Sequence, residues 1–306
     1  MQYDLVIIGG GPAGVAAGVY AARKKLKTAL ITKDFEGQSV VSEGIQNWIG
    51  EVSIPGPELV KKFREHLDAY KDDVVEIHEG HWAEKLEKKG DQNFLLTTDK
   101  GEFSSKAVII CSGATRRRLE VPGADIFEHK GVTYCASCDG PLFSGMDVVV
   151  VGGGNAGFET AAQLLAYAKS VTLLHRGETF KADPITVERV LSHENMTGIT
   201  NANIKKVNGE KFVTGITYEV NGEEKELPTA GVFIEIGMVP STDFAANLVE
   251  LDDYKRIKVD GKSQQTTTPG VWAAGDCTNE LYHQNNIAAG DAVKALEDAY
   301  VHLKAK

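Results

Sequence analysis

Four unbroken apolar runs along the chain predict buried strands, and each run is followed by a glycine within two residues. They cover residues 5–8, 107–111, 148–151 and 271–274. Alanine-rich or amphipathic segments between and after them predict helices at 15–25, 57–71, 158–167 and 286–305. Strands that alternate with helices in this order predict an α/β fold.

The first apolar run leads into a glycine-rich loop that matches the pattern G-x-G-x-x-G. The loop contains Gly9, Gly11, Pro12, Ala13 and Gly14. A predicted helix and then a strand at 28–32 follow it, which is the βαβ context of a dinucleotide-binding domain. Glycines there permit a tight turn and let a pyrophosphate approach the positive end of the helix.

The same order of strand, glycine loop, helix and strand recurs about 140 residues later. The second loop contains Gly152, Gly154, Asn155, Ala156 and Gly157. Two such units predict two Rossmann-like domains and two bound dinucleotides. Short alternating stretches predict a β-meander in each domain, at 74–77, 94–98 and 103–105 in the first and at 212–220 and 224–227 in the second.

Two cysteines separated by two residues precede the second unit, in the stretch Cys135-Ala136-Ser137-Cys138-Asp139. Such a pair can form a redox-active disulfide, half of a zinc site or two structural thiols. A zinc site needs a second ligand pair at suitable spacing, which the sequence lacks. The position beside a dinucleotide-binding unit favours redox chemistry, with Asp139 as a candidate proton donor.

Composition narrows the class of protein. The chain has 306 residues, 42% of them hydrophobic and 25% charged, which is enough for two soluble globular domains. A net charge of −10 argues against nucleic acid or an anionic membrane as the main partner. We expect no membrane span, no signal peptide and no metal site, and four cysteines suit a reducing cytoplasm.

Several polar positions near the predicted strands have more than one interpretation. Asp34 and Glu36 follow the second strand, where an acid could bind ribose hydroxyls, and neither stands directly at the strand tip. Asp276 follows the last apolar run, where it could bind a sugar alcohol, cap a helix or occupy a turn. Cys111 is expected to be an inert core thiol, and we assign no role to Cys277. The run 115–118 is expected to be a solvated hinge.

These motifs together resemble the low-molecular-weight thioredoxin reductases and the closely related C-terminal core of the alkyl hydroperoxide reductase flavoprotein. The similarity covers essentially the whole chain. Its most specific parts are 9–14, 36–38, 47–50, 131–140, 152–157, 175–176 and 275–277. The chain departs from the usual pattern at Glu36, where the family has glycine, and at His283, where it has arginine.

The resemblance implies that the first glycine loop binds FAD and the second binds the nicotinamide nucleotide. The implied FAD site also contains Asp34, Gly37, Gln38, Asn47, Gly113, Gly275, Asp276, His283 and Gln284. The FAD-binding domain would be split between residues 1–115 and 243–306, with a nucleotide and disulfide domain inserted at 116–242. The family implies that this inserted domain rotates and that the enzyme is a homodimer.

The implied activity is electron transfer from NAD(P)H through FAD to a Cys135–Cys138 disulfide and then to thioredoxin or a thioredoxin-like protein. Cys138 would face the flavin, Cys135 would attack the partner disulfide, and Asp139 would donate a proton. One alternative is an NADH-dependent reductase of a peroxiredoxin-like or glutaredoxin-like partner. Another is a redox sensor that does not turn over.

The nucleotide is expected to be NADPH, with NADH as the alternative. The second strand of the second unit ends at His175 and Arg176, without the acid that NAD-specific units place there. Arg176 and Lys181 can bind a 2′-phosphate. Because Gly177 stands where the family usually has a further arginine, we predict only weak discrimination.

Overall fold

The computed structural model describes residues 2–41 and 44–304, without the side chains of Val41 and Cys138. The chain divides into two compact units: unit 1 comprises residues 1–115 and 239–306, and unit 2 comprises residues 116–238. Both units combine parallel sheets with helices, which confirms the predicted α/β, Rossmann-like fold class. The chain passes between the units twice, through β7 (Ala114–Arg116) and β16 (Met238–Pro240), which pair with each other.

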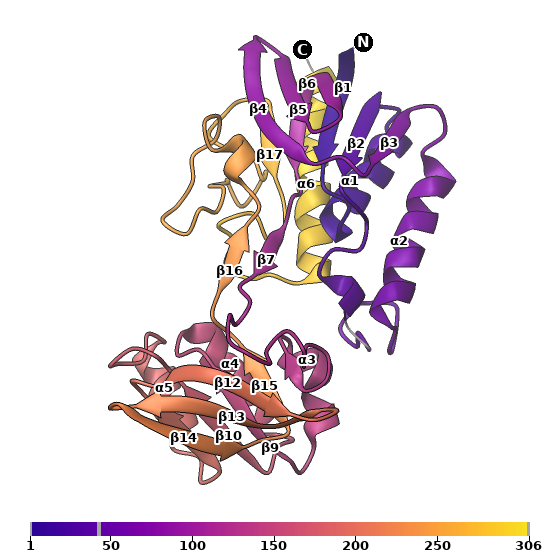
Figure 1. Ribbon diagram of the computed structural model, residues 1–306. Coiled ribbons are helices and arrows are strands. Elements are labelled where there is room, and N and C mark those ends of the chain that lie inside the picture. Colours follow the sequence, from indigo (N-terminus) through magenta and orange to yellow (C-terminus); the bar gives the residue numbers. More distant parts are fainter. Residues whose placement is uncertain (1, 42–43, 305–306) are drawn as a thin grey trace. The chain divides into compact units, whose positions relative to one another are not determined.

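The main sheet of unit 1 has the strand order β3-β2-β1-β6-β5-β4, with β17 also paired to β6 (Figure 1). Its parallel strands are β1 (Gln2–Ile8), β2 (Thr28–Thr32), β3 (Val75–Glu79), β6 (Gly101–Ile110) and β17 (Val271–Ala273). An antiparallel extension consists of β4 (Ala83–Gly90) and β5 (Asn93–Thr98). Because β1, β6 and β17 run parallel, the segments that follow them leave the sheet at the same edge.

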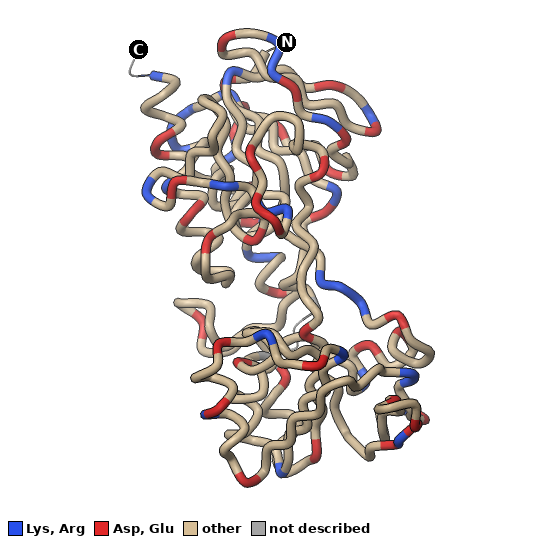
Figure 2. Tube along the Cα trace, turned by 90° about the vertical axis from the view of Figure 1, so that its left-hand side faces the viewer, with Lys and Arg blue, Asp and Glu red and all other residues tan. Residues whose placement is uncertain are grey.

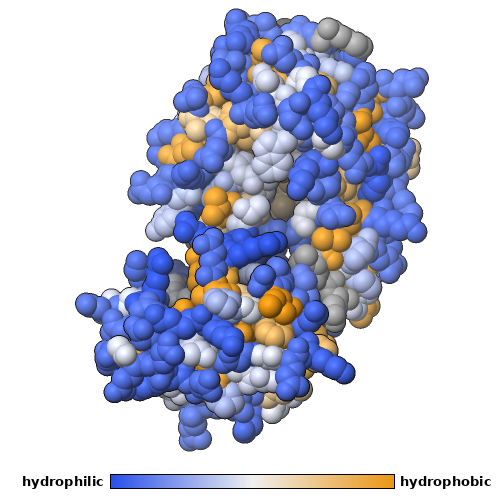
Figure 3. Space-filling model, in the orientation of Figure 1, coloured by the Kyte–Doolittle hydropathy of each residue, from blue (hydrophilic) through white to orange (hydrophobic). Residues whose placement is uncertain are grey.

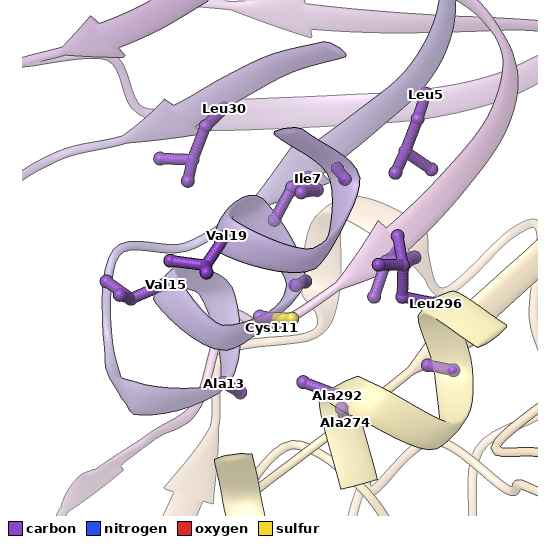
Figure 4. Close-up of a cluster of buried hydrophobic side chains, with 14 of the residues drawn as sticks. Leu5, Ile7, Ala13, Val15, Val19, Leu30, Cys111, Ala274, Ala292 and Leu296 are labelled. Carbon is purple, nitrogen blue, oxygen red and sulfur yellow. The ribbon is translucent and has the colours of Figure 1, made fainter. Parts of the chain in front are cut away.

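Helices α1 (Pro12–Arg23), α2 (Gly56–Tyr70) and α6 (Asn285–Lys304) belong to unit 1. Alanines and glycines on α1 and α6 allow close packing, and their buried residues form one core with strands β1, β2 and β6 (Figure 4). Short 3-10 turns occur at Ser39–Val41 and Asp243–Ala245. Cys111 lies in the core beneath the glycine loop, as expected for an inert thiol.

Unit 2 has a parallel sheet of strand order β11-β10-β9-β15-β8. The strands are β8 (Val132–Thr133), β9 (Asp147–Val151), β10 (Ser170–Leu174), β11 (Met196–Ile199) and β15 (Gly231–Ile234). Residues of this sheet take part in two hydrophobic core clusters. One cluster includes apolar residues of α4 (Asn155–Leu164) and α5 (Pro184–Leu191), and the other includes residues of an antiparallel sheet. That second sheet contains β12 (Asn203–Gly209), β13 (Val213–Val220) and β14 (Glu223–Pro228).

The prediction for the first β-meander is wrong in one respect. Residues 75–77 of the predicted stretch belong to β3, which pairs in parallel with β2, and the meander contains β4 instead. The sequence of β4, AEKLEKKG, buries only Leu86 because this strand lies at the sheet edge, so it lacks an alternating apolar signal. Strand β12 of the second meander was missed for the same reason, since it is an edge strand rich in polar residues.

Acidic and basic residues are interspersed along both units (Figure 2). The face shown in Figure 3 is largely hydrophilic, with separate hydrophobic patches. Among the described helices, none combines the length and the apolar character that crossing a bilayer requires.

Candidate functional site

The first glycine loop connects β1 to α1 and is shaped by contacts that only glycine permits. Gly9 has φ +120°, and a Cβ there would stand 2.1 Å from the Cys111 carbonyl oxygen. A Cβ on Gly14 would stand 1.9 Å from the carbonyl oxygen of Gly9, so the helix packs directly on the turn. A Cβ on Gly11 would meet no atom within 4 Å, and α1 begins without a side-chain cap. The space at Gly11, directly before Pro12 and the buried Ala13 of the first turn of α1, is therefore suited to an anion.

Polar residues from distant parts of unit 1 meet near this loop. The Gln38 amide donates hydrogen bonds to the Ala114 carbonyl oxygen at 2.7 Å and to the Asp276 carboxylate at 3.3 Å. The His283 imidazole lies 3.6 Å from the same carboxylate. Gln38 and Asp276 are separated by 238 residues in the sequence, so the fold places these predicted site residues in one group.

A second pair of predicted FAD residues, Asn47 and Gln284, joins the loop that follows Ile45 to the segment before α6. The Asn47 amide donates a hydrogen bond to the Gln284 side-chain oxygen at 2.9 Å, and Asn286 donates to the Asn47 carbonyl oxygen at 2.6 Å. Both side chains of the Asn47–Gln284 pair are solvent-exposed. These contacts hold two loops together beside the Asp276 group without burying their polar atoms.

The remaining predicted FAD residues lie in turns around the same strands. Gly37, Gly113 and Gly275 have positive φ values of +52°, +65° and +76°, which favour glycine. Asp34 is half-buried, and its carboxylate accepts a hydrogen bond from the Glu36 backbone N–H at 3.1 Å. Asp34 therefore stabilises the turn after β2.

The second glycine loop repeats the geometry of the first. Gly152 has φ +132°, and a Cβ there would stand 2.1 Å from the Glu235 carbonyl oxygen. A Cβ on Gly157 would stand 1.9 Å from the Gly152 carbonyl oxygen, whereas Gly154 faces open space. Asn155 and Ala156 are exposed on the first turn of α4, which has no side-chain cap. This loop can also receive a pyrophosphate.

The segment after β10 contains the residues predicted to bind the 2′ position. The His175 ring is buried beneath Gly153, and among the described residues its Nε2 atom has no hydrogen-bond partner. Burial, assisted by Lys181 and Arg176, lowers the pKa of His175. Arg176 and Lys181 are exposed and form no ion pair with any described residue. The Lys181 backbone N–H donates to the Gly153 carbonyl oxygen at 2.7 Å, which ties this segment to the loop.

The cysteine motif lies on unit 2, directly after β8. Cys135 is half-buried and disulfide-bonded, and it immediately precedes the short helix α3 (Ala136–Asp139). The side chain of Cys138 lies outside the described part of the structure. Asp139 accepts a hydrogen bond from the Thr133 hydroxyl, and Ser137 donates one to Gln163 at 2.8 Å. Strand β8 and helix α4 therefore fix the motif from both ends.

The other two cysteines are free and fully buried in unit 1. Burial raises the pKa of Cys111 well above its usual value and that of Cys277 to about 11, so neither thiol forms a thiolate readily at neutral pH. Within the described residues, no group of three or more His, Cys, Asp or Glu side chains is arranged to hold a metal ion.

Glu235 is a residue beside the second loop that the sequence interpretation missed. It follows β15, and its carboxyl group accepts a hydrogen bond from the Thr160 hydroxyl of α4 at 2.8 Å. Burial raises the pKa of Glu235 to about 7, against the lowering effect of Thr160 and Arg116. The only signal in the sequence is an acid directly after the apolar run 232–234, which many surface turns also have.

The Glu235→Gln variant is expected to change the pH dependence of stability. The pKa of Glu235 in the folded chain lies above its ordinary value of 4.5, so the folded state holds the proton more tightly. The contribution of protonated Glu235 to the free energy of unfolding is therefore fully present below pH 4.5 and is lost as the pH rises through about 7. Glutamine stays neutral at every pH, so the variant does not lose this stability as the pH rises. We expect its free energy of unfolding to exceed that of wild type by on the order of 2–3 kcal/mol at pH 8 but by little at pH 5. Thermal melts at both pH values measure the difference, and equal shifts at both would contradict it.

Comparison with known proteins relates the whole chain to one family. The sequence profile described as "Pyridine nucleotide-disulphide oxidoreductase" matches residues 3–294. Curated relatives include an "NADH dehydrogenase" of Bacillus subtilis, 40% identical over 304 residues, and an alkyl hydroperoxide reductase component of Escherichia coli, 36% identical over 304 residues. Each alignment covers 98% of this chain but 58% of the relative, so the chain spans less than two thirds of their length.

Solved structures similar to this chain include thioredoxin reductases. The enzyme from Streptococcus pyogenes superposes with a TM-score of 0.89 at 34% identity, covering 100% of this chain and 99% of that one. The enzyme from T. acidophilum superposes with a TM-score of 0.68 at 37% identity, covering 98% of both chains.

Proposed function

Because the chain belongs to the pyridine nucleotide-disulphide oxidoreductase family, we propose that it is an FAD-dependent, NAD(P)H-dependent reductase of a disulfide in a thioredoxin-like protein. The resemblance drawn from the sequence motifs is confirmed at the level of the family. The observation that carries the proposal is a disulfide-bonded Cys135 on the unit that also contains the second glycine loop. When bound, FAD supplies a two-electron relay between the nicotinamide nucleotide and this disulfide.

The residues of unit 1 fit FAD. The open space at Gly11 and the uncapped start of α1 suit the pyrophosphate, and the Gln38–Asp276 group offers hydrogen bonds to the sugar-alcohol chain. Asn47 and Gln284 present exposed amides from neighbouring loops. We expect one non-covalent FAD per chain, since all these groups come from one unit.

The redox step on unit 2 uses thiol–disulfide exchange. We propose that Cys135 and Cys138 form the disulfide, since the remaining two cysteines are buried and free. After two electrons and two protons reduce it, the Cys135 thiolate attacks the partner disulfide and forms a mixed disulfide. Attack by Cys138 on this mixed disulfide releases the partner dithiol and restores the bond. We infer that Asp139, whose carboxyl group accepts a hydrogen bond from Thr133, supplies a proton to a leaving thiolate.

Steady-state turnover tests this function. The purified flavoprotein is mixed with NADPH or NADH and an oxidised thioredoxin, and free thiols are counted with a thiol reagent. Two thiols per nucleotide oxidised, over many turnovers, support the proposal. A single reduction that then stops would instead favour the redox sensor. We also propose a cytoplasmic location, because the free cysteines Cys111 and Cys277 suit a reducing compartment.

A second candidate partner is a peroxiredoxin-like protein. A specific observation favours it, because one relative that aligns with 98% of this chain is part of an alkyl hydroperoxide reductase. The same exchange chemistry serves either partner, so the choice depends on docking rather than on the cysteines. Comparing kcat/KM for a thioredoxin and for an oxidised peroxiredoxin separates the two, since the physiological class should be reduced more efficiently.

The Arg176→Ala variant is expected to lower kcat/KM for NADPH by roughly tenfold to a hundredfold and to leave NADH unaffected. Arg176 is exposed beside the second loop without an ion-pair partner among the described residues, so it can bind a 2′-phosphate. Stopped-flow or steady-state kinetics with both nucleotides measure the effect. Lys225→Ala, which removes an exposed positive charge on β14, is the matched control. An equal loss with both nucleotides would show that Arg176 does not select the 2′-phosphate.

We also propose a homodimer. Ile49 and Val52 are 85% and 94% exposed, and Leu281 and Tyr282 are 78% and 69% exposed. These residues lie on the two loops joined by the Asn47–Gln284 hydrogen bond, so they form neighbouring apolar surface on unit 1. Light scattering at several protein concentrations measures the mass, and a Val52→Asp variant should favour the monomer.

A further inference from the structure

Glu235 lies where a nucleotide-binding sheet changes its winding direction. Strand β9 pairs with β10 on one side and with β15 on the other, and the glycine loop follows β9 while Glu235 follows β15. The Glu235 backbone N–H donates to the Val151 carbonyl oxygen at 2.8 Å, which fixes it against the start of the loop. Ligands of open α/β sheets bind in the crevice at this point.

The carboxyl group of Glu235 is held on the helix that begins at the loop. Thr160, its hydrogen-bond partner at 2.8 Å, is buried on the second turn of α4. With a rise of about 1.5 Å per residue, Thr160 lies roughly 7.5 Å along the axis from Asn155. The other charged groups that act on Glu235 are Arg116, from the chain crossing, and Glu159, on the exposed face of α4. A charge on Glu235 is therefore close to the loop and poorly solvated.

We propose that Glu235 is a pH-sensing residue of the second glycine loop, which takes up a proton when an anionic dinucleotide binds there. This inference rests on the proposed function, because it assigns the nicotinamide nucleotide to this loop. The pyrophosphate of the nucleotide carries negative charge, and a carboxylate behind the loop repels it. The pKa of Glu235 is about 7, so its carboxyl group changes between the neutral and the charged form at physiological pH.

The sign of the effect follows from linkage. Bound nucleotide favours the neutral carboxyl group and raises the pKa of Glu235 above its value in the free protein, which is about 7. Affinity is therefore highest below pH 7 and falls as the pH rises through that value. If binding raises this pKa by one, Kd increases roughly tenfold between pH 6 and pH 9.

Titration calorimetry of the purified flavoprotein with NADP⁺, from pH 6 to pH 9, tests the proposal without turnover. Measurements at pH 7 in two buffers of different ionisation enthalpy report the protons taken up on binding. The Glu235→Gln variant keeps an acceptor for Thr160 but cannot titrate, so its Kd should lose the tenfold increase and its proton uptake should fall. The 2′-phosphate has a pKa of about 6. Its protonation, like that of His175, is the same in both proteins, so both contributions to the pH dependence cancel when wild type and variant are compared. Glu226→Gln, which removes an exposed acid on β14, is the matched control and should resemble wild type.

The outcomes separate this inference from the proposed function. Binding with the same pH dependence in wild type and Glu235→Gln overturns the role of Glu235 and leaves the nucleotide site in place. Absence of NADP⁺ and NAD⁺ binding at every pH overturns the assignment of the loop, and the inference with it. A flattened profile in Glu226→Gln as well as in Glu235→Gln would show a general charge effect and would also overturn the specific role of Glu235.

Discussion

Replacement of Cys135 by serine is expected to lower the rate of partner-disulfide reduction by at least about a thousandfold, because the attacking thiolate is lost. Cys135 is the disulfide-bonded cysteine of unit 2, and a serine hydroxyl cannot form or break a disulfide. Reduction of ferricyanide by NADPH should persist, since a one-electron dye does not require the cysteine pair. Parallel assays with oxidised thioredoxin and with ferricyanide measure the two activities on the same preparation.

Two further variants complete this experiment. Cys138→Ser should lose partner reduction to the same extent if the two cysteines act as a pair. Cys111→Ala removes a buried free thiol of unit 1 and should keep both activities. If the Cys135→Ser variant reduces thioredoxin at the wild-type rate, the cysteine motif takes no part in the reaction. Loss of both activities would instead indicate a folding defect.

The elements built from local patterns were predictable from the sequence. Gly9 and Gly152 end apolar runs, and each loop is stabilised by a glycine five residues later whose missing Cβ lets the helix pack on the turn. Such contacts depend on neighbouring residues, so a short motif specifies them. Strand β4 was not predictable in this way, because it is a polar edge strand with Leu86 as its buried residue.

The candidate site was predictable only where a family motif names its residues. The Gln38–Asp276 hydrogen bond joins positions 238 residues apart, and nothing in the local sequence pairs them. Glu235 shows the same limit more strongly, since its shifted pKa arises from burial between β15 and α4. Burial and long-range pairing are properties of the folded chain, so an isolated acid in the sequence does not reveal them.

Gly9→Ala is expected to destabilise unit 1 by about 3–5 kcal/mol and to yield protein without bound flavin. The new Cβ would stand 2.1 Å from the Cys111 carbonyl oxygen, and the backbone at φ +120° strains any other residue. Because the clash is with backbone, no side-chain rotation relieves it. Flavin absorbance per chain and a thermal melt measure the two effects, and a stable yellow protein would contradict the prediction.

Gly11→Ala separates the fold from the ligand at the same loop. A Cβ at Gly11 meets no atom within 4 Å, and its φ of −73° suits alanine, so the cost to the fold should stay within about 1 kcal/mol. If a pyrophosphate approaches the backbone here, the same methyl group blocks it, and FAD affinity should fall at least about tenfold. Apoprotein titrated with FAD gives the affinity, and a melt of the apoprotein gives the stability. Unchanged affinity would place the pyrophosphate elsewhere, whereas a lost fold would mean that the space at Gly11 is needed by the chain itself.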